Sequence, residues 1–294
     1  HELLPLVAKE SGMGSQEYLS SSIQKAALLV TLKNYTAATE LLGNYFQMAD
    51  ISSSAFDELT VTPTDHSLAL DTSAAIDLKL GKVDEAISTF EKKLKFLEQH
   101  LPNDKEMKSD TMHKLGCLLS YKKNHEEALP LLQGALDTRK FLYNGRNKFL
   151  IESSWAVAAA NQSLGDTDKA LADYEKLLEK IDLVEDSPIS SVVVQNSAGK
   201  LFFEGGKLEA AVSSFTKALE GVETQGDDVL KKNIMLNLAN ALSAKGDIDG
   251  AFELYEDLER MGKRKRNQLY FFALYNKSLL LIKNGEKEQA KDIL

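Results

Sequence analysis

Small and bulky apolar positions repeat along most of the chain at an interval of about forty residues. A short polar turn is followed by an alanine seven times, at Ala38, Ala86, Ala128, Ala170, Ala211, Ala251 and Ala290. The steps between these anchor alanines are 48, 42, 42, 41, 40 and 39 residues. A period of this length is typical of a helical repeat array and not of a compact enzyme core.

Three further positions test this period independently of the alanines. Five residues before the anchor, five of the seven repeats have glycine, although glycine makes up only about 7% of ordinary sequence; the residues are Lys33, Gly81, Lys123, Gly165, Gly206, Gly246 and Gly285. Twelve residues before it, every residue is small: Ala26, Ala74, Gly116, Ala158, Gly199, Ala239 and Ser278. Four residues after it, every residue is bulky: Leu42, Phe90, Leu132, Tyr174, Phe215, Tyr255 and Leu294.

These positions predict one helix hairpin in each repeat. A small residue on each helix permits close approach, and the bulky residue one turn later fills the space beside the contact. Glycine in the turn can adopt a positive φ and end the first helix, helix A. The anchor alanine is expected to begin the second helix, helix B, which Asp166 and Asp247 can cap in their repeats.

The pattern resembles the tetratricopeptide repeat, in which small residues flank a glycine turn and an aromatic residue follows in helix B. Repeats near 42 residues, with Glu126 to Leu132 followed by Ala135 to Lys140, are similar to the longer kinesin light chain type. The general resemblance covers residues 15–294. It implies an all-α fold, a right-handed superhelical solenoid of about seven helix hairpins.

Residues at the ends and in the connections predict less regular structure. Residues 1–14 contain four large apolar residues before a Gly-Met-Gly break, which predicts an N-terminal cap or the tail of a preceding helix. We expect residues 15–294 to form the array, truncated at its C-terminus. Residues 51–65 predict a lengthened loop, and Ser187-Pro188 predicts a helix start.

Composition and charge exclude several classes of protein. The chain of 294 residues has no apolar run long enough to cross a bilayer and no N-terminal signal pattern. The single cysteine, Cys117, excludes an internal disulfide framework and predicts a reducing, cytoplasmic location, with a removed targeting segment left open. The net charge of −9 disfavours nucleic-acid binding. The basic run Lys263–Arg266 is interpreted as a solvated inter-repeat loop, with a localisation signal or a contact to an acidic partner as the alternatives.

The resemblance implies that function lies on a concave face lined by helix A. The inward positions are then 18, 15, 11 and 8 residues before each anchor, and often also 14. Asparagine amides there can hold the backbone of a ligand through paired donor and acceptor groups. Trp155 is either an aromatic anchor for a partner or a packing residue. The predicted partner-binding residues are His113, Lys114, Trp155, Asn196, Lys200, Phe203, Asn237, Asn240 and Asn276.

One stripe of residues offers groups that could bind a metal or act as a nucleophile with its base. Asp110, His113 and Cys117 stand at i, i+3 and i+7 of one helix. No fourth ligand stands at suitable spacing, and no HExxH, paired CxxC or glycine-rich phosphate loop occurs. We favour a structural role for the stripe, and predict no catalytic residue, metal or cofactor.

The last repeat is apolar on its inward positions. Phe272, Tyr275, Leu279 and Ile282 occupy them, and a surface of this kind rarely stays exposed on a monomer. A C-terminal capping segment, a partner or self-association are the three candidate covers, with the capping segment favoured.

The sequence as a whole predicts a non-enzymatic scaffold or adaptor that binds a peptide or helical segment of a partner in the groove. The alternative is a peptide-responsive regulator whose output domain lies outside this sequence, and an appended enzyme is a third reading. The chaperone-binding carboxylate clamp of the family is not matched, because Leu236 stands where its first lysine should be.

Overall fold

The computed structural model describes residue 7 and residues 15–51, 62–143, 147–181, 183–184, 189–263 and 268–293. Over these residues the chain is all-α, with fourteen helices and no strand. The helices form seven consecutive hairpins, as the sequence predicts. The chain divides into two compact units, His1–Leu142 and Tyr143–Leu294, so that the boundary falls between the third and fourth hairpins.

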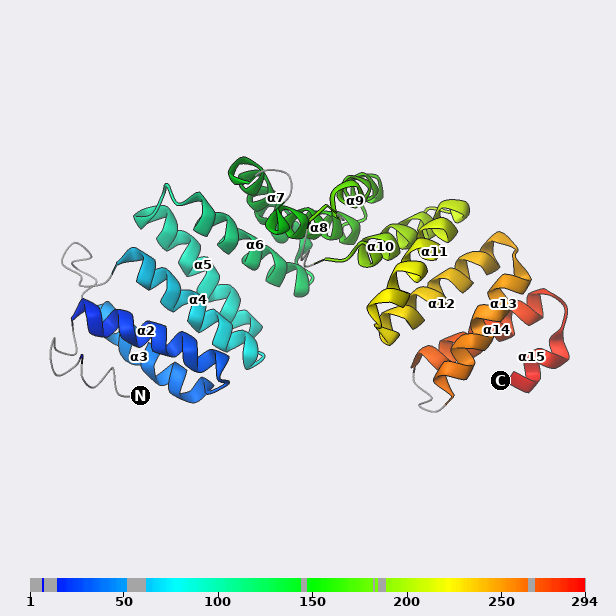
Figure 1. The fold of residues 1–294 in the computed structure, drawn as a ribbon, viewed down its shortest axis with the longest axis horizontal. Coiled ribbons are helices and arrows are strands. Elements are labelled where there is room, and N and C mark those ends of the chain that lie inside the picture. Colours follow the sequence, from blue (N-terminus) through cyan, green and yellow to red (C-terminus); the bar gives the residue numbers. More distant parts are fainter. Residues whose placement is uncertain are drawn as a thin grey trace. The chain divides into compact units, whose positions relative to one another are not determined.

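The first unit contains three hairpins (Figure 1). Helix A and helix B of each hairpin are α2 (Gln16–Thr31) with α3 (Tyr35–Ile51), α4 (Pro63–Lys79) with α5 (Val83–His100), and α6 (Lys105–Tyr121) with α7 (His125–Leu142).

The second unit contains four hairpins (Figure 1). They are α8 (Lys148–Ser163) with α9 (Thr167–Ile181), α10 (Ser191–Glu204) with α11 (Leu208–Gln225), α12 (Asp228–Lys245) with α13 (Ile248–Gly262), and α14 (Gln268–Lys283) with α15 (Lys287–Ile293).

The turn of every hairpin contains one residue in the left-handed backbone region. It is always the residue five positions before the anchor alanine, so the predicted turn is confirmed. The five glycines there have φ between 71° and 95°, and Lys33 and Lys123 adopt 60° and 64° without being glycine. The left-handed residue ends helix A and reverses the chain within a few residues.

The anchor alanines are the fourth residues of their helices, so the prediction that they begin helix B is wrong by three positions. Each anchor N–H donates to the carbonyl four residues earlier, for example Ala170 to Asp166 at 3.0 Å. The three preceding residues are already helical, but they have no such bond within the helix. The Asp247 side chain caps α13 as predicted, accepting from the Gly250 N–H at 3.1 Å.

The small and bulky positions face each other across the hairpin. All seven anchors are at most 1% exposed. A Cβ placed on Gly116 would lie 2.7 Å from Cγ of Leu132, and one on Gly199 would lie 2.6 Å from Cε1 of Phe215. The small residue on helix A therefore makes room for the bulky residue on helix B, as the spacing predicts.

Some sequence expectations concern residues outside the described part of the chain. The N-terminal cap falls there apart from residue 7, as do most of the lengthened loop, the Ser187-Pro188 pair, Leu294 and three of the four residues in the basic run. The described helix α10 begins at Ser191, with Ser190 as its N-cap. None of the described helices combines the length and apolar character needed to cross a membrane.

Candidate functional site

A pocket of about 200 Å³ lies on the helix A face of the second unit, between α10 and α12. Its lining contains four of the predicted partner-binding residues. They are joined by Glu204 and by Phe215 of helix B, which is 1% exposed and closes the base. The lining residues are Lys200, Phe203, Glu204, Phe215, Asn237 and Asn240. A pocket of this size suits one side chain or one peptide unit better than a whole small-molecule ligand.

The amide of Asn237 is held by the preceding repeat. Its Nδ2 donates to Oδ1 of Asn196 at 3.0 Å. Asn196 is 8% exposed and lies on α10, so this bond joins two successive A helices. With its nitrogen engaged in this bond, Asn237 keeps its Oδ1 as an acceptor, and the residue lines the pocket.

The amide of Asn240 is held through its oxygen, whereas that of Asn237 is held through its nitrogen. Its Oδ1 accepts from the Tyr255 hydroxyl at 2.7 Å and from Nδ2 of Asn276 at 2.8 Å. Two donors occupy both lone pairs of that oxygen, so the Nδ2 group remains for other partners. Tyr255 comes from helix B and is 2% exposed, and burial raises the pKa of its phenol well above the usual range.

Asn237 and Asn240 therefore present one acceptor and one donor at the same pocket. They stand three residues apart on α12, on adjacent turns of one face. A peptide unit carries one N–H and one C=O, so this pair of amides can satisfy both groups of a ligand backbone. The inter-repeat bonds also account for the asparagines without any ligand, and the ligand role stays a prediction.

Lys200 adds an exposed cation to the pocket. Among the described residues no carboxylate forms an ion pair with it, although Glu204 lies one turn further along α10. The neighbouring A helices α12 and α14 carry five lysines and one acidic residue, whereas the B helices α11 and α13 carry eight acidic and two basic residues. Negative charge in the second unit thus lies mainly on helix B.

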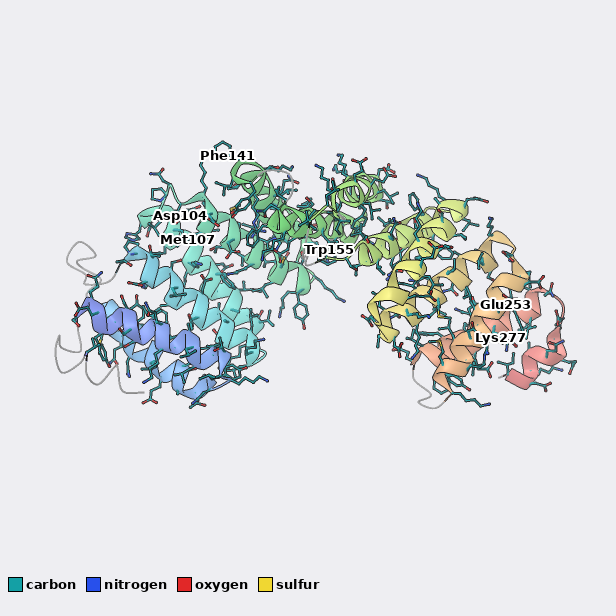
Figure 2. All side chains as sticks on the ribbon, in the orientation of Figure 1. Asp104, Met107, Phe141, Trp155, Glu253 and Lys277 are labelled. Atoms are coloured by element: carbon teal, nitrogen blue, oxygen red, sulfur yellow. The ribbon has the colours of Figure 1, made fainter. Side chains whose placement is uncertain are left out.

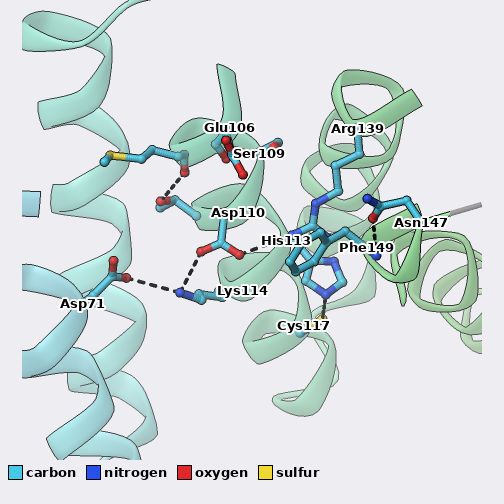
Figure 3. Close-up of polar contacts among 12 residues, drawn as sticks. Asp71, Glu106, Ser109, Asp110, His113, Lys114, Cys117, Arg139, Asn147 and Phe149 are labelled. Atoms are coloured by element: carbon cyan, nitrogen blue, oxygen red, sulfur yellow. Dashed lines mark hydrogen bonds and ion pairs between the residues drawn. The ribbon is translucent and has the colours of Figure 1, made fainter. Parts of the chain in front are cut away.

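His113 and Lys114 lie in the first unit, in a different setting (Figure 3). Nζ of Lys114 lies 2.7 Å from Oδ2 of Asp110 and 3.4 Å from Oδ1 of Asp71. Asp71 also forms an ion pair with buried Lys93, whose Nζ lies 2.5 Å from Oδ2 of Asp71. Asp110 pairs with buried Arg139, whose Nη2 lies 3.3 Å from Oδ1 of Asp110. Five charges of alternating sign therefore join α4, α5, α6 and α7, and carboxylates already hold the ammonium of Lys114.

The stripe of Asp110, His113 and Cys117 is part of the same packing. His113 is 6% exposed, and its Nε2 lies 3.7 Å from Sγ of Cys117. Burial, with a smaller effect of nearby Arg139, lowers the pKa of His113 to about 4, so the imidazole is neutral near pH 7. Over the described residues, no group of three or more His, Cys, Asp and Glu side chains is arranged to hold a metal.

Trp155 lies on α8 and is half-buried (Figure 2). Its ring packs against a core cluster that includes Tyr174 and Val194, and it is not among the residues that line the α10–α12 pocket. The structure thus brings Lys200, Phe203 and the four asparagines together within the second unit. Trp155 of the same unit does not line the pocket, and His113 and Lys114 belong to the first unit.

Three residues of the site, Glu204, Phe215 and Tyr255, are absent from the sequence prediction. Phe215 and Tyr255 belong to the bulky position of helix B, which the sequence assigns to the core alone. A signal was present for Tyr255, because a buried tyrosine needs a partner for its hydroxyl and the other repeats have Phe or Leu at several of these positions.

Comparison with known families identifies the repeat. The profile of the tetratricopeptide repeat matches residues 109–182, and a second profile of the same description matches residues 233–260. The chain is a tetratricopeptide repeat protein. The matched segments cover the fourth hairpin and most of the third and sixth, including their turn and packing positions described above.

Solved structures share the fold at low sequence identity. The putative kinesin light chain repeats of Podosopora anserina match with a TM-score of 0.57 and 18% identity, covering 68% of this chain and 96% of theirs. The apo form of RapI matches with a TM-score of 0.70 and 13% identity, covering 95% and 73%. NprR in complex with its cognate peptide NprX matches with a TM-score of 0.54 and 14% identity, covering 93% and 74%. No curated protein matches the chain in sequence.

Proposed function

We propose that this tetratricopeptide repeat protein is a non-catalytic scaffold that binds an extended segment of a partner protein at the α10–α12 pocket. The observation that carries the proposal is the fixed orientation of two amides. Asn196 engages the nitrogen of Asn237, while Tyr255 and Asn276 engage the oxygen of Asn240. The pocket therefore offers one acceptor and one donor that need little reorganisation on binding.

The remaining lining supports a peptide ligand with mixed character. Phe203 and Phe215 provide apolar surface for one side chain of the ligand, and Lys200 provides a cation at the edge. Backbone recognition by the amides would supply affinity, while the apolar floor and the lysine would select the side chains. The cognate-peptide complex of NprR supports this class of ligand for the fold.

The test is a selection of random twelve-residue peptides displayed against the chain, followed by affinity measurements on the enriched peptides. Asn237→Ala and Lys200→Ala should each weaken binding, the first by tenfold or more. Asn233→Ala is the matched control, because this residue lies one turn earlier on α12 and its amide bonds only to the Val229 carbonyl of its own helix.

A melting curve for each variant separates lost binding from lost stability, because Asn237→Ala also removes the bond to Asn196. Enriched peptides that bind Asn237→Ala, Lys200→Ala and the unchanged chain equally would place the binding surface away from the pocket. That result would contradict the proposed function.

The second candidate is a peptide-responsive regulator, which the fold similarity to RapI and to peptide-bound NprR favours. Small-angle scattering with and without a selected peptide distinguishes the two. A decrease in the radius of gyration on binding supports the regulator, and an unchanged radius supports the scaffold.

A further inference from the structure

A second pocket in the second unit lies where α13 meets α14 and α15 (Figure 1). Its volume is about 240 Å³, and its lining shares no residue with that of the α10–α12 pocket. Four apolar side chains line it: Ile248 and Phe252 of α13, and Leu280 and Leu281 of α14. The two leucines are at most 4% exposed, so the pocket has an apolar floor.

The charged part of the lining is acidic. Asp249 is exposed in the first turn of α13, and Glu286 lies directly before α15. Among the described residues, neither carboxylate forms an ion pair. Nζ of Lys277 lies 4.7 Å from the centre of the Phe252 ring, but two glutamates of α13 already hold this ammonium. The pocket therefore combines an apolar floor with two negative charges.

An earlier junction between two hairpins shows which group suits this arrangement. Asp84 stands two residues before its anchor, as Asp249 does, and Lys122 stands six residues before the next anchor. Nζ of Lys122 lies 3.0 Å from Oδ1 of Asp84. In the first unit, the repeat geometry thus places a lysine ammonium beside the carboxylate at this position.

The junction of α13 with α14 and α15 lacks this lysine. Asn284 stands six residues before its anchor instead, and its Nδ2 donates to Oε1 of Glu286 at 2.6 Å. An asparagine side chain carries no charge, so it cannot neutralise Asp249. The position that an ammonium fills in the first unit therefore lies here at the edge of a pocket, whose apolar floor suits the methylene groups of a lysine.

A further hairpin stacked on α14 and α15 would leave this edge accessible. Glu209 and Lys245 occupy the corresponding positions one junction earlier. Both are exposed, although α14 and α15 follow them in the same unit. The exposure of Asp249 and Asn284 is thus a property of the junction itself, whatever sequence follows residue 294.

We propose that the pocket formed by α13, α14 and α15 binds a lysine side chain of a partner protein. The methylene groups of that lysine lie on Phe252 and Leu281, and its ammonium lies beside Asp249 and Glu286, in the arrangement that Lys122 shows. Charge complementarity sets the class of ligand, because a neutral or acidic side chain would leave both carboxylates without a cation. The site does not depend on the function proposed for the α10–α12 pocket.

The test uses two small probes of nearly equal shape. Nα-acetyl-lysine methylamide carries the ammonium, and Nα-acetyl-norleucine methylamide has the same carbon chain without it. Each is titrated into the full chain labelled with ¹⁵N, and NMR follows the side-chain amides of Asn284 and Gln289, which line the pocket. The lysine probe should shift these signals and bind at least fivefold more tightly than the norleucine probe, while the amide signals of Asn237 and Asn240 stay in place.

Variants of the chain locate the binding of the lysine probe. Asp249→Asn should weaken it at least fivefold. Asn284→Lys should do the same, because the introduced side chain can take the place of the ligand as Lys122 does. Glu209→Gln is the matched control, because it changes the net charge equally at the same position of the preceding helix B, outside the pocket. Its affinity should stay within twofold of the unchanged chain, and circular dichroism checks that every variant folds.

Three results would overturn the proposal. They are absence of binding by the lysine probe, equal binding of the norleucine probe, and unchanged binding to Asp249→Asn or Asn284→Lys. Sedimentation velocity of the chain alone adds a fourth outcome. A dimer that Asp249→Asn abolishes would make a lysine of a second copy the occupant of the pocket, which also contradicts the proposal.

Discussion

At the scale of single residues, the turn of each hairpin requires a backbone conformation more than a particular side chain. Five repeats meet this requirement with glycine, which adopts a positive φ without steric cost. Lys33 and Lys123 adopt the same conformation although each carries a Cβ. For a residue with a Cβ, the left-handed region costs about 1–2 kcal/mol.

Replacing Lys123 with glycine should therefore stabilise the protein. We expect Lys123→Gly to raise the free energy of unfolding by about 1 kcal/mol, because relief of the left-handed strain outweighs the greater entropy of glycine in the unfolded chain. Urea denaturation measures the change. Lys92→Gly, at an exposed position inside α5, should lower the free energy of unfolding by about 1 kcal/mol. The expectation fails if both substitutions destabilise the chain.

Tyr255 illustrates a residue with two roles. Its ring fills the bulky position of helix B, and its hydroxyl fixes the amide of Asn240 at the pocket. The core of the sixth hairpin is thereby linked to the helix A face by one hydrogen bond.

At the scale of the helices, each hairpin is defined by close approach at one small residue. Gly199 packs against the Phe215 ring so closely that a Cβ on Gly199 would lie 2.6 Å from Cε1 of the ring. Gly43 in α3 is also a helical glycine, but no atom lies within 4 Å of the Cβ position. A substitution at Gly43 therefore tests helix propensity alone, whereas one at Gly199 also tests the packing of the two helices.

Alanine substitutions at these two glycines should have opposite effects. Gly43→Ala should stabilise the chain by about 0.5–1 kcal/mol, because alanine is the better helix former. Gly199→Ala should destabilise it by about 1–3 kcal/mol, because the added methyl group overpacks the contact with a buried ring. Thermal denaturation with calorimetric readout compares them. A stabilising effect at Gly199 would mean that α10 and α11 can move apart at little cost.

At the scale of the whole molecule, stability is distributed along the array, because each hairpin packs mainly on its neighbours. In the first unit, the alternating charges that run from Lys93 through Asp71 and Lys114 to Asp110 and Arg139 join the second and third hairpins. Lys93 and Arg139 are 1% and 2% exposed, so their charges depend on these carboxylates.

Asp71→Asn should disturb this part of the array alone. The substitution leaves buried Lys93 without its carboxylate, which should cost about 2–3 kcal/mol, below the usual cost for a fully buried pair because Asp71 is partly exposed. Native-state hydrogen exchange should become faster in α4, α5 and α6 and stay unchanged in α12, α13 and α14. Faster exchange along the whole chain would indicate that all hairpins unfold as one cooperative unit.

A control for this experiment is the surface pair of Lys122 and Asp84, whose atoms lie 3.0 Å apart with the Asp84 side chain 74% exposed. Asp84→Asn should change the free energy of unfolding by less than about 1 kcal/mol, because solvent already screens an exposed pair. Exchange in α4, α5 and α6 should then match that of the unchanged chain.

The sequence by itself determines the hairpins, because their requirements are local. A left-handed turn residue, a small residue twelve positions before the anchor and a bulky residue four positions after it act within about sixteen residues of chain. The spacing of the repeats then specifies seven hairpins and the residues that each one buries. Each helix B begins three residues earlier than the sequence predicts. The N–H groups of the first turn of a helix have no hydrogen bond within the helix, so no such bond marks where the helix begins.

Only the tertiary structure decides what the polar residues on the A helices do. The pairing of Asn237 with Asn196, and of Asn240 with Tyr255 and Asn276, joins residues 15 to 41 positions apart. Whether an amide presents its oxygen or its nitrogen to the pocket depends on which group a neighbouring helix occupies. The stacking of one repeat on the next makes this choice for Asn237, and for Asn240 it acts together with Tyr255 of the same hairpin.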